Sequence, residues 1–511
     1  MKSISLLFVI ALFLVSIGQV NAVSETTMQP ENIPNEPQRS ENLEDLPHIE
    51  FDPFTVRHDS AGLDSFIRYM MDTQHFPGVA TWCSKNGQVV WQRSYGYANL
   101  QDSIAVTDTT SFLLASISKT FTATAIMQLW ERGLFDLDED VNNHLDFDVR
   151  NPYYPDSAIT FRMLMTHTST IHDNWGMLPP WLPGDHPLPL GDFVYEYLVP
   201  GGIYYSPANF YNAVPGLLYD YSNAAIALLG YLVEAIEDSF PIHCQDSIFI
   251  PLEVNHTSWF LCNLDTNNVA ARYQWTGTNY VRYPHSGCAF YPSAQLRASS
   301  VDIARHLTAI QQYGVIDTVR ILDSATVSLM ISQQFVGPGF IQGLTWRYLN
   351  LYGRWIWYHG GGMTGVSTLY GFCPAENSAV VVLVNRGNSS TNTYSIVDAL
   401  FDYAEQYGVE ECKSLPPAIV NLQVNPNPFR NTTNIRYSIL DTRYSIQNPT
   451  LSIYNATGRL VRQWGHTTVR LSDNIRWDGR DQSNRQLGSG IYFLKLEAEH
   501  YSAIEKLLLT R

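Results

Sequence analysis

The sequence predicts an α+β domain, in which an antiparallel sheet lies beside a cluster of helices, followed by a smaller all-β sandwich. Residues 79–97 and 368–385 have the apolar and alternating runs of strands, whereas helical patterns follow Ser116, Tyr221 and Ser300. Near the C-terminus, short alternating runs are separated by Gly, Asn and Asp turns. A chain of 511 residues exceeds the usual range of one hydrophobic core, so two or more domains are expected.

The N-terminus has the three regions of a secretory signal peptide. Met1-Lys2 precedes an apolar run from Ile4 to Ile17, and Val20-Asn21-Ala22 fits a cleavage site. We therefore expect residues 1–22 to be a signal peptide. The apolar run is too short for a stable membrane span, and a retained anchor is the alternative. Residues 23–58 are acidic, contain proline and have few large apolar residues, so we expect a disordered linker there.

The strands and helices of the first domain follow from hydrophobic periodicity. The run 379–384 is apolar throughout, which predicts a strand covered on both faces. After Ser116, apolar residues at helical spacing continue to Gly133, a plausible stop; they are Phe121, Ala125, Ile126, Leu129 and Trp130. We expect the cleft to lie between the helices and the sheet, with His359 on the edge strand facing Ser116.

Composition narrows the classes of partner. Lys and Arg total 31 and Asp and Glu total 48, giving a net charge of -17, so nucleic acid is not an expected partner. Six scattered cysteines, which argue against a zinc ribbon, are compatible with either disulfides or buried free thiols: Cys83, Cys244, Cys262, Cys288, Cys373 and Cys412.

Three short segments together supply the parts of a lysine-assisted serine acyl-transfer site: Ser116-Ile117-Ser118-Lys119, Tyr221-Ser222-Asn223 and His359-Gly360-Gly361. Ser116 and Lys119, at i and i+3, share one face if a helix begins at the serine, whose N-terminal position also favours a developing alkoxide. A serine hydroxyl needs a proton acceptor, and a lysine serves when its pKa is lowered. Tyr221 can share the proton load.

Each segment also has a purely structural interpretation. Ser116 could be a helix N-cap with a solvated Lys119, and Ser222 or Asn223 could cap a helix over 224–234. The glycines after His359 could form a tight turn. The occurrence of all three segments in a workable order within one domain-sized stretch favours catalysis.

Beyond these segments, residues 63–407 resemble the serine beta-lactamase-like superfamily, in particular its branch of class C beta-lactamases, carboxylesterases and D-stereospecific peptidases. This resemblance implies the beta-lactamase/transpeptidase-like fold. The residues that carry it, besides the three motifs, are 76–79, 85–87, 96–98, 159–169, 215–216, 219–223 and 296–304.

The resemblance implies a role for each matching residue. Ser116 matches the nucleophile, Lys119 its base, and Tyr221 the tyrosine that relays protons to and from the leaving group. Asn223 matches the position that touches the acyl side chain of the substrate. The implied oxyanion hole is formed by the backbone N–H groups of Ser116 and Gly362.

The histidine motif departs from the pattern of many relatives, which have Lys-Thr-Gly at 359–361. Gly360 offers no hydroxyl, and His359 replaces a permanent cation, so strong carboxylate binding at neutral pH is not expected. The resemblance then favours hydrolysis of an ester, amide or D-amino-acid-containing peptide bond, with His359, Gly360 and Gly361 lining the substrate site. The alternatives are a beta-lactamase or penicillin-binding carboxypeptidase, and an inactive cell-surface binding protein with the same fold. We expect activity to fall as pH drops through the histidine range, because charging His359 would disturb the cleft around Lys119.

No metal or cofactor is expected. His167 and His172, with Asp173 adjacent, could suggest a metal site, but no third cluster of ligands accompanies them. The loop 173–200, rich in Pro, Trp and Leu, is interpreted either as a lid or wall of the cleft or as a packed surface loop.

The C-terminal region resembles the immunoglobulin-like sorting module of type IX secretion cargo. The residues that carry this resemblance are 425–429, 453–455, Gly458, 477–480, 489–492 and 506–508. The expected domains are thus a hydrolase at 59–410, a linker at 411–417 and a sorting domain at 418–511. The resemblance implies a secreted or cell-surface bacterial protein whose partners are a small ester, amide or peptide substrate and the secretion machinery, without a stable transmembrane segment.

Overall fold

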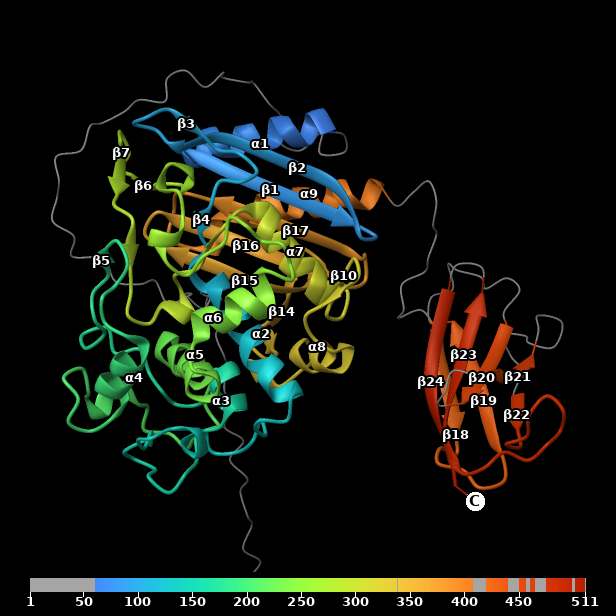
Figure 1. Cartoon of the computed structure of the whole chain (residues 1–511). Helices are drawn as coiled ribbons and strands as arrows, with labels where there is room; N and C mark the ends of the chain where they lie inside the picture. Colours follow the sequence, from blue (N-terminus) through green and yellow to red (C-terminus); the bar gives the residue numbers. More distant parts are fainter. Residues whose placement is uncertain are drawn as a thin grey trace, which may run out of the picture.

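A computed structural model describes residues 60–337, 339–407, 420–439, 450–455, 460–464, 475–498 and 501–510 (Figure 1). The expected signal peptide, the acidic linker 23–58, the linker 411–417 and Cys412 lie outside the described residues. The five described cysteines are free thiols, and only Cys262 among them is exposed.

The first domain is built on a nine-stranded sheet in which all described neighbours are antiparallel. Its order is β12-β13-β14-β15-β16-β17-β1-β2-β3. The strands are β1 (Gly78–Lys85), β2 (Gln88–Asn99), β3 (Ile104–Ala105), β12 (Phe335–Gly337), β13 (Phe340–Gln342), β14 (Arg347–Leu351), β15 (Arg354–Met363), β16 (Val366–Cys373) and β17 (Ser378–Val384).

Strand β17 is buried on both faces, as its continuous apolar run predicts. Val380 and Val382 enter one core, which includes residues of α1 (Ser60–Gln74) and α9 (Tyr394–Gln406). Val381 and Leu383 enter the other core, on the side of the remaining helices. The sheet therefore lies between two helical layers of unequal size (Figure 1).

The larger layer holds α2 (Ser118–Glu131) and α5 (Asn223–Glu237) at its centre. Residues 118–127 of α2 are all buried, so this helix has no solvent face over its first turns, unlike the one-sided apolar pattern expected. The helix ends near Gly133, which has a φ of 72°. Around this pair lie α3 (Phe161–Met165), α4 (Leu190–Leu198), α6 (Phe240–Cys244), α7 (Ser300–Gln311) and α8 (Ser324–Met330).

Short antiparallel ladders connect the loops of this layer. The pairs are β4 (Phe112–Leu113) with β9 (Arg297–Ala298), β5 (Leu182–Pro183) with β8 (Ser286–Gly287), β6 (Arg272–Trp275) with β7 (Tyr280–Tyr283), and β10 (Val315–Ile316) with β11 (Val319–Arg320).

The C-terminal part is all-β and consists of two antiparallel sheets. One has the order β18-β19-β22 and the other β21-β20-β23-β24. Their side chains, including Phe429, Trp477 and Leu494, form one apolar core. The strands are β18 (Val420–Asn425), β19 (Thr433–Ile439), β20 (Thr450–Asn455), β21 (Leu460–Trp464), β22 (Ile475–Trp477), β23 (Gly490–Ala498) and β24 (Tyr501–Leu509).

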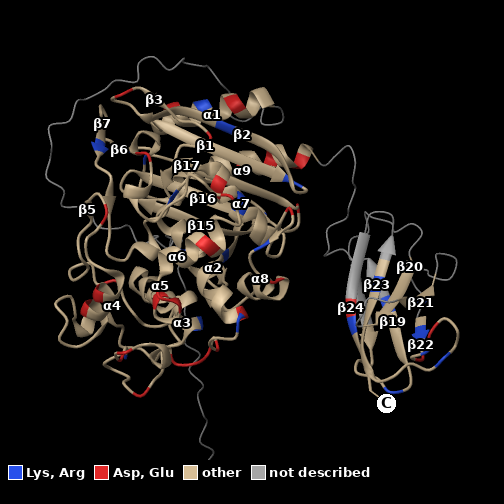
Figure 2. Cartoon of the chain, in the orientation of Figure 1, with Lys and Arg blue, Asp and Glu red and all other residues tan. Residues whose placement is uncertain are grey.

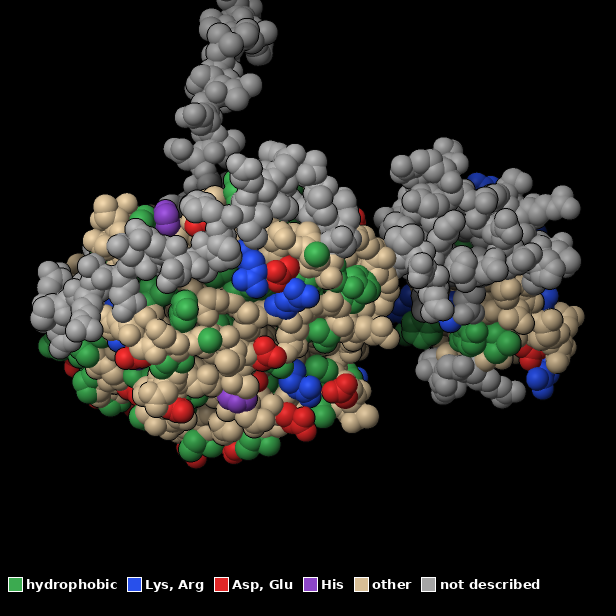
Figure 3. Space-filling view, turned by 90° about the horizontal axis from the view of Figure 1, so that it is seen from above, with side chains coloured by type: hydrophobic (Ala, Val, Ile, Leu, Met, Phe, Trp, Pro, Cys, Tyr) green, Lys and Arg blue, Asp and Glu red, His purple; other side chains and the backbone are tan. Residues whose placement is uncertain are grey.

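The charged surface is mixed in sign. Acidic and basic residues are interspersed along the described chain (Figure 2), and the face seen from above shows opposite charges side by side (Figure 3). On α1 and β2, Asp64 accepts from Arg68 at 2.9 Å and from Arg93 at 2.7 Å. Within the described ranges, none of the helices combines the length and apolar character needed to cross a bilayer.

Candidate active site

Ser116 lies at the centre of a 3₁₀ turn, Ala115–Ile117, that runs directly into α2. The α-helix proper begins two residues later than expected, at Ser118, but the serine still lies at the N-terminal end of continuous helical structure. Ser116 is half-buried between two fully buried neighbours. Ala115 has a φ of 49°, a left-handed conformation that non-glycine residues rarely adopt. The Ser118 hydroxyl holds this turn by donating to the Ala115 carbonyl at 2.6 Å.

Lys119 is completely buried and directed at Ser116. Its Nζ donates to Ser116 Oγ at 3.1 Å, to Asn223 Oδ1 at 2.7 Å and to the Ser293 carbonyl at 2.8 Å. Asn223 Oδ1 and the Ser293 carbonyl oxygen can only accept hydrogen bonds. A neutral Lys119 amine has two protons, which these two oxygens accept. The remaining position on Nζ, the lone pair, is then directed at Ser116 Oγ.

Tyr221 directly precedes the N-cap of α5. Ser222 caps this helix by accepting from Ala225 N at 3.0 Å, so the structural interpretation of this segment is correct, and the catalytic interpretation stays a prediction. The cap fixes the backbone that carries Tyr221. Its ring lies 4.7 Å from Lys119 Nζ and 5.0 Å from the Arg347 guanidinium carbon.

A buried carboxylate, Asp173, orients Asn223. It accepts from the Asn223 backbone N–H at 2.9 Å and from Asn223 Nδ2 at 2.7 Å, and also from Ala224 N at 3.0 Å. Holding Nδ2 turns Oδ1 toward Lys119. Burial raises the pKa of Asp173, while these hydrogen bonds and the charge of Lys119 act in the opposite direction.

The third segment lies on β15, opposite the turn that carries Ser116. β15 is an interior strand, which corrects the expectation of an edge strand, but β14 pairs with it only as far as Tyr358. The rest of β15 packs against the Ser116 turn. A Cβ on Gly361 would lie 2.1 Å from the Leu114 carbonyl oxygen, so only glycine permits this close approach. Gly360 is buried beside it, and Gly362, the expected oxyanion donor, packs against Ser389.

His359 is buried and neutral at physiological pH. Its Nδ1 lies 2.8 Å from the Gly360 carbonyl, which can only accept, so Nδ1 carries the proton. Burial, together with the positive charges of Arg347 and Lys119, lowers the pKa of His359 well below its ordinary value. The expected loss of activity on charging His359 is therefore displaced to more acidic pH than the usual histidine range.

His167 is a second buried imidazole at the site. Its ring centroid lies 4.4 Å from that of Tyr221, and its Nδ1 accepts from Ser222 N at 3.3 Å. Burial and the charges of Lys119 and Arg347 likewise lower its pKa. His172 lies apart from it and pairs with Asp220 at 3.0 Å. In the described part of the chain, no group of three His, Cys, Asp or Glu side chains is placed to hold a metal ion.

Arg347, on β14, brings a permanent cation to the site. Besides covering the Tyr221 ring, its Nη2 donates to the Tyr219 hydroxyl at 2.9 Å. The sequence motifs do not indicate a catalytic role for Arg347, Asp173 or Ser293, because these residues contact the motifs only through the tertiary structure. One local pattern does place Arg347 near the histidine motif. Strands β14 and β15 form a hairpin whose turn contains Gly353, and this hairpin pairs Arg347 with Tyr358, the residue before His359.

The loop 173–200 is packed rather than open. It contains β5 and α4, and Trp181, Phe193 and Tyr197 are buried in the larger core. The Tyr197 hydroxyl donates to the His172 carbonyl at 2.7 Å. These contacts agree with the interpretation of a packed loop, and the interpretation as a wall of the cleft stays a prediction.

Comparison with known proteins gives two family matches. Residues 63–402 match the model described as Beta-lactamase, and residues 423–510 match the secretion system C-terminal sorting domain. The second match indicates a protein that is secreted or displayed at the cell surface by type IX secretion.

Curated relatives and solved structures show similarity to the first domain. Protein flp of Staphylococcus aureus (strain N315) is 24% identical over 325 residues, which is 63% of this chain and 62% of the relative, so the chain spans less than two thirds of that protein. Penicillin-binding protein 4* of Bacillus subtilis (strain 168) is 26% identical over 197 residues, 38% of this chain and 40% of the relative.

Among solved structures, the penicillin binding protein from Bacillus halodurans is 21% identical, with a TM-score of 0.54 over 66% of this chain and 99% of that chain. EstCE1, a hydrolase with promiscuous acyltransferase activity, is 19% identical, with a TM-score of 0.55 over 66% of this chain and 97% of that chain. At this identity the structural likeness shows the fold.

Proposed function

The chain belongs to the beta-lactamase family of serine hydrolases, and from this premise we propose that it cleaves an ester, amide or D-amino-acid-containing peptide bond through an acyl-enzyme on Ser116. The observation that carries the proposal is the position of Lys119. A buried amine whose two other hydrogen-bonding directions are occupied, 3.1 Å from a half-buried serine hydroxyl, has the geometry of a general base.

Acylation begins when Ser116 Oγ attacks the substrate carbonyl carbon. Lys119 must be neutral for this step, and its Nζ then takes the proton of Ser116 Oγ. The carbonyl oxygen becomes an oxyanion, which the backbone N–H groups of Ser116 and Gly362 stabilise. The intermediate then collapses, the bond to the leaving group breaks, and the leaving group takes a proton through Tyr221.

Deacylation reverses these roles. A water molecule attacks the acyl carbon, and its proton passes to the Tyr221–Lys119 pair. The acyl–Oγ bond breaks, the carboxylic acid leaves, and Ser116 recovers its hydroxyl proton. Asn223 holds Lys119 in place throughout, because Asp173 fixes its amide.

The test is to incubate the full chain with a short-chain p-nitrophenyl ester and with nitrocefin, and to map any adduct by intact and peptide mass spectrometry. We expect ester turnover with an adduct on Ser116 and little cleavage of nitrocefin. Ser116→Ala is expected to abolish both turnover and adduct, while Ser65→Ala, an exposed hydroxyl on α1, leaves them unchanged. Retained turnover in Ser116→Ala refutes the assignment, and rapid nitrocefin cleavage supports the beta-lactamase alternative. Absence of turnover and adduct with both substrates supports the inactive binding protein.

Arg347 favours one substrate class within this range, the carboxypeptidase-like one. Its guanidinium lies against the ring of Tyr221, the residue proposed to protonate the leaving group. An arginine fork recognises a carboxylate through paired hydrogen bonds. We therefore infer that leaving groups with a free carboxylate, such as a C-terminal D-amino acid, are preferred, with Arg347 supplying the cation that neutral His359 cannot.

The corresponding prediction compares an acyl-D-alanyl-D-alanine peptide with its C-terminal amide. Arg347→Ala should lower kcat/KM for the free carboxylate about tenfold or more, because a charge-assisted contact is lost. The amidated peptide, which lacks the charge, should change by much less. Equal losses for both peptides would mean that Arg347 acts on Tyr221 rather than on a substrate carboxylate.

A further inference from the structure

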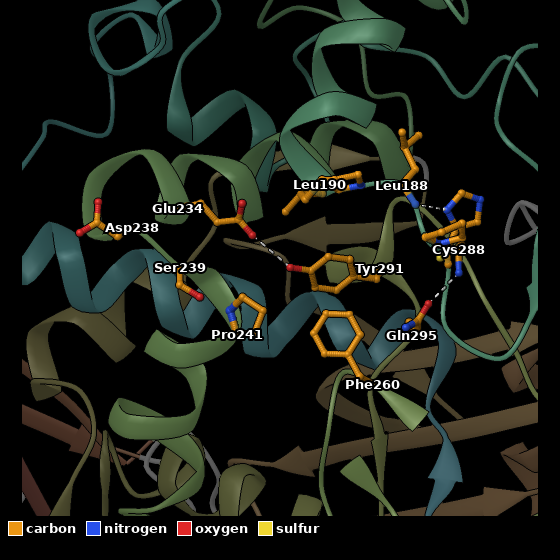
Figure 4. Close-up of a pocket in the computed structure, with 13 residues that line it drawn as sticks. Leu188, Leu190, Glu234, Asp238, Ser239, Pro241, Phe260, Cys288, Tyr291 and Gln295 are labelled. Carbon is orange, nitrogen blue, oxygen red and sulfur yellow. Dashed lines mark hydrogen bonds between the residues drawn. The ribbon is translucent and has the colours of Figure 1, made fainter. Parts of the chain in front are cut away.

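A cavity lies between the segment that leads into α4, the end of α5 and residues 288–295 (Figure 4). Ser116, Lys119, Tyr221 and His359 do not line it. Its volume of about 300 Å³ falls at the lower end of the range for small-molecule sites. The mechanism proposed above does not use any of the side chains that line it.

The walls of this cavity combine apolar and polar surface, and the apolar part lies on two sides. Leu188 and Leu190 close one side, while Pro241, Phe260 and Tyr291 form the other (Figure 4). The rings of Phe260 and Tyr291 pack with their centroids 5.1 Å apart and their planes at 50°. An apolar body of the size of one ring would therefore contact aliphatic and aromatic groups together, and aromatic faces also attract cations.

A carboxylate provides the charge of the cavity. Glu234 is half-buried on α5, and one of its carboxylate oxygens accepts from the Tyr291 hydroxyl at 3.1 Å. Asp238, at the rim, is the second acidic residue of the lining. The basic member of the lining is His186, whose pKa is lowered by burial, so that it is neutral at physiological pH. Across the described residues, Glu234 has no Lys or Arg within ion-pair distance.

We propose that this cavity is a binding site for a small organic cation, with an ammonium group on Glu234 and a compact apolar body between Leu190, Phe260 and Tyr291. The ligand class follows from the combination of a carboxylate that lacks a protein cation and walls that suit a ring or short alkyl chain. The inference does not depend on the proposed hydrolase chemistry.

The location gives such a site a connection to Lys119. Tyr291 and Ser293 belong to one 3₁₀ turn, and the carbonyl of Ser293 accepts from Lys119 Nζ at 2.8 Å. The neighbouring Pro292 carbonyl accepts from Thr122 on α2 at 2.7 Å. A ligand that packs on the Tyr291 ring therefore contacts the same turn whose Ser293 carbonyl accepts from Lys119.

The experiment is calorimetric titration of the full chain with three probes of one size: benzylammonium, benzyl alcohol and benzoate, at pH 7 and fixed ionic strength. We expect saturable one-to-one binding of benzylammonium, and binding of the neutral and anionic probes that is weaker by about tenfold or more. Glu234→Gln should weaken benzylammonium binding by a similar factor and leave the alcohol unaffected. Asp246→Asn, which removes one exposed negative charge outside the lining, should leave all three unchanged.

A cavity-filling variant tests the location without touching the charge. Leu188→Trp places an indole in the space while Glu234 stays intact, and binding of benzylammonium should be lost. This variant also decides the question if Glu234→Gln does not fold. Absence of saturable binding, equal affinity for benzyl alcohol, or unchanged binding in Glu234→Gln or Leu188→Trp would each overturn the proposal.

Discussion

Asp173 is connected to Lys119, the proposed general base, through the side chain of Asn223. Its carboxylate holds the Asn223 amide, whose oxygen in turn holds Lys119. The same carboxylate accepts two backbone N–H groups at the start of α5, where a negative charge is favoured by the helix dipole. One buried carboxyl group thus contacts a helix terminus and also orients the amide that holds the proposed proton acceptor.

We predict that Asp173→Asn lowers kcat by about a hundredfold, because the amide of Asn223 is then free to reverse and small displacements of a base are costly. The free energy of unfolding should fall by about 2 kcal/mol, as buried donors lose a charged acceptor. Measurements are kcat, its pH profile and urea unfolding. A purely structural role would change stability and leave the pH profile in place.

Asp302 provides a matched control. It is also a buried carboxylate at the start of a helix, α7, and accepts from Thr257 Oγ1 at 2.9 Å. Asp302→Asn should destabilise the protein comparably but leave kcat of the folded fraction unaltered. Equal effects of the two variants on kcat would contradict a positioning role for Asp173.

At the scale of elements, helices α5 and α7 both begin with a serine N-cap. Ser222 caps α5 by accepting from Ala225 N, and Ser299 caps α7 by accepting from Asp302 N at 3.1 Å. Only the first cap adjoins Tyr221, the side chain proposed to relay protons. The two caps share the same backbone contact, but the Ser222 hydroxyl also donates to Asp173 Oδ1 at 3.3 Å.

We predict that Ser222→Ala and Ser299→Ala each lower the free energy of unfolding by about 1 kcal/mol, the usual value of an N-cap. Ser222→Ala should in addition lower kcat, since the backbone that carries Tyr221 loses its anchor, whereas Ser299→Ala should not. Thermal unfolding and ester turnover measure the two effects. If both variants keep full activity, the cap does not position Tyr221.

Elements defined by local sequence were predicted well. The cap of α5, the start of α7, the continuous apolar strand β17 and the Ser116–Lys119 pair depend on neighbours a few residues apart. Contacts that complete the site are distant in sequence: Lys119 and Ser293 are 174 residues apart, and Asn223 and Asp173 are 50 apart. Periodicity carries no information about such pairs, so the sequence suggests Asp173 only as a possible metal ligand and indicates no role for Arg347.

At the scale of the whole molecule, several imidazoles are buried in their neutral form. Burial lowers the pKa of His285 and of His306 to about 3, and the pKa values of His167 and His359 are also lowered. The unfolded chain takes up protons on these groups near pH 6.5, but the native state does not. Native stability is therefore fully present above pH 6.5 and is lost as pH falls toward the native pKa values.

We predict that the free energy of unfolding declines below pH 6.5, by up to about 1.4 kcal/mol per pH unit for each such histidine. Asp173, Glu234 and Glu376, whose pKa values are raised, act in the opposite sense, so the parent slope is a net value. His306→Gln isolates one group. The variant should be less stable than the parent by a larger margin at pH 8 than at pH 5. At pH 5 protonation of His306 in the unfolded chain already destabilises the parent, and the variant lacks this effect. Urea unfolding at both values measures this, and a pH-independent difference would contradict it.

The pairing of β1 with β17 affects how the chain folds during its synthesis. Val79 lies opposite Val384, so the first strand of the sheet is joined to one of the last, across some three hundred residues. Until that late strand has been synthesised, the β1–β2 hairpin keeps an apolar edge that lacks its neighbour. A fragment that stops short of Val384 would therefore expose a self-associating edge. A fragment that folds without self-association should therefore include nearly the whole first domain, from β1 to β17.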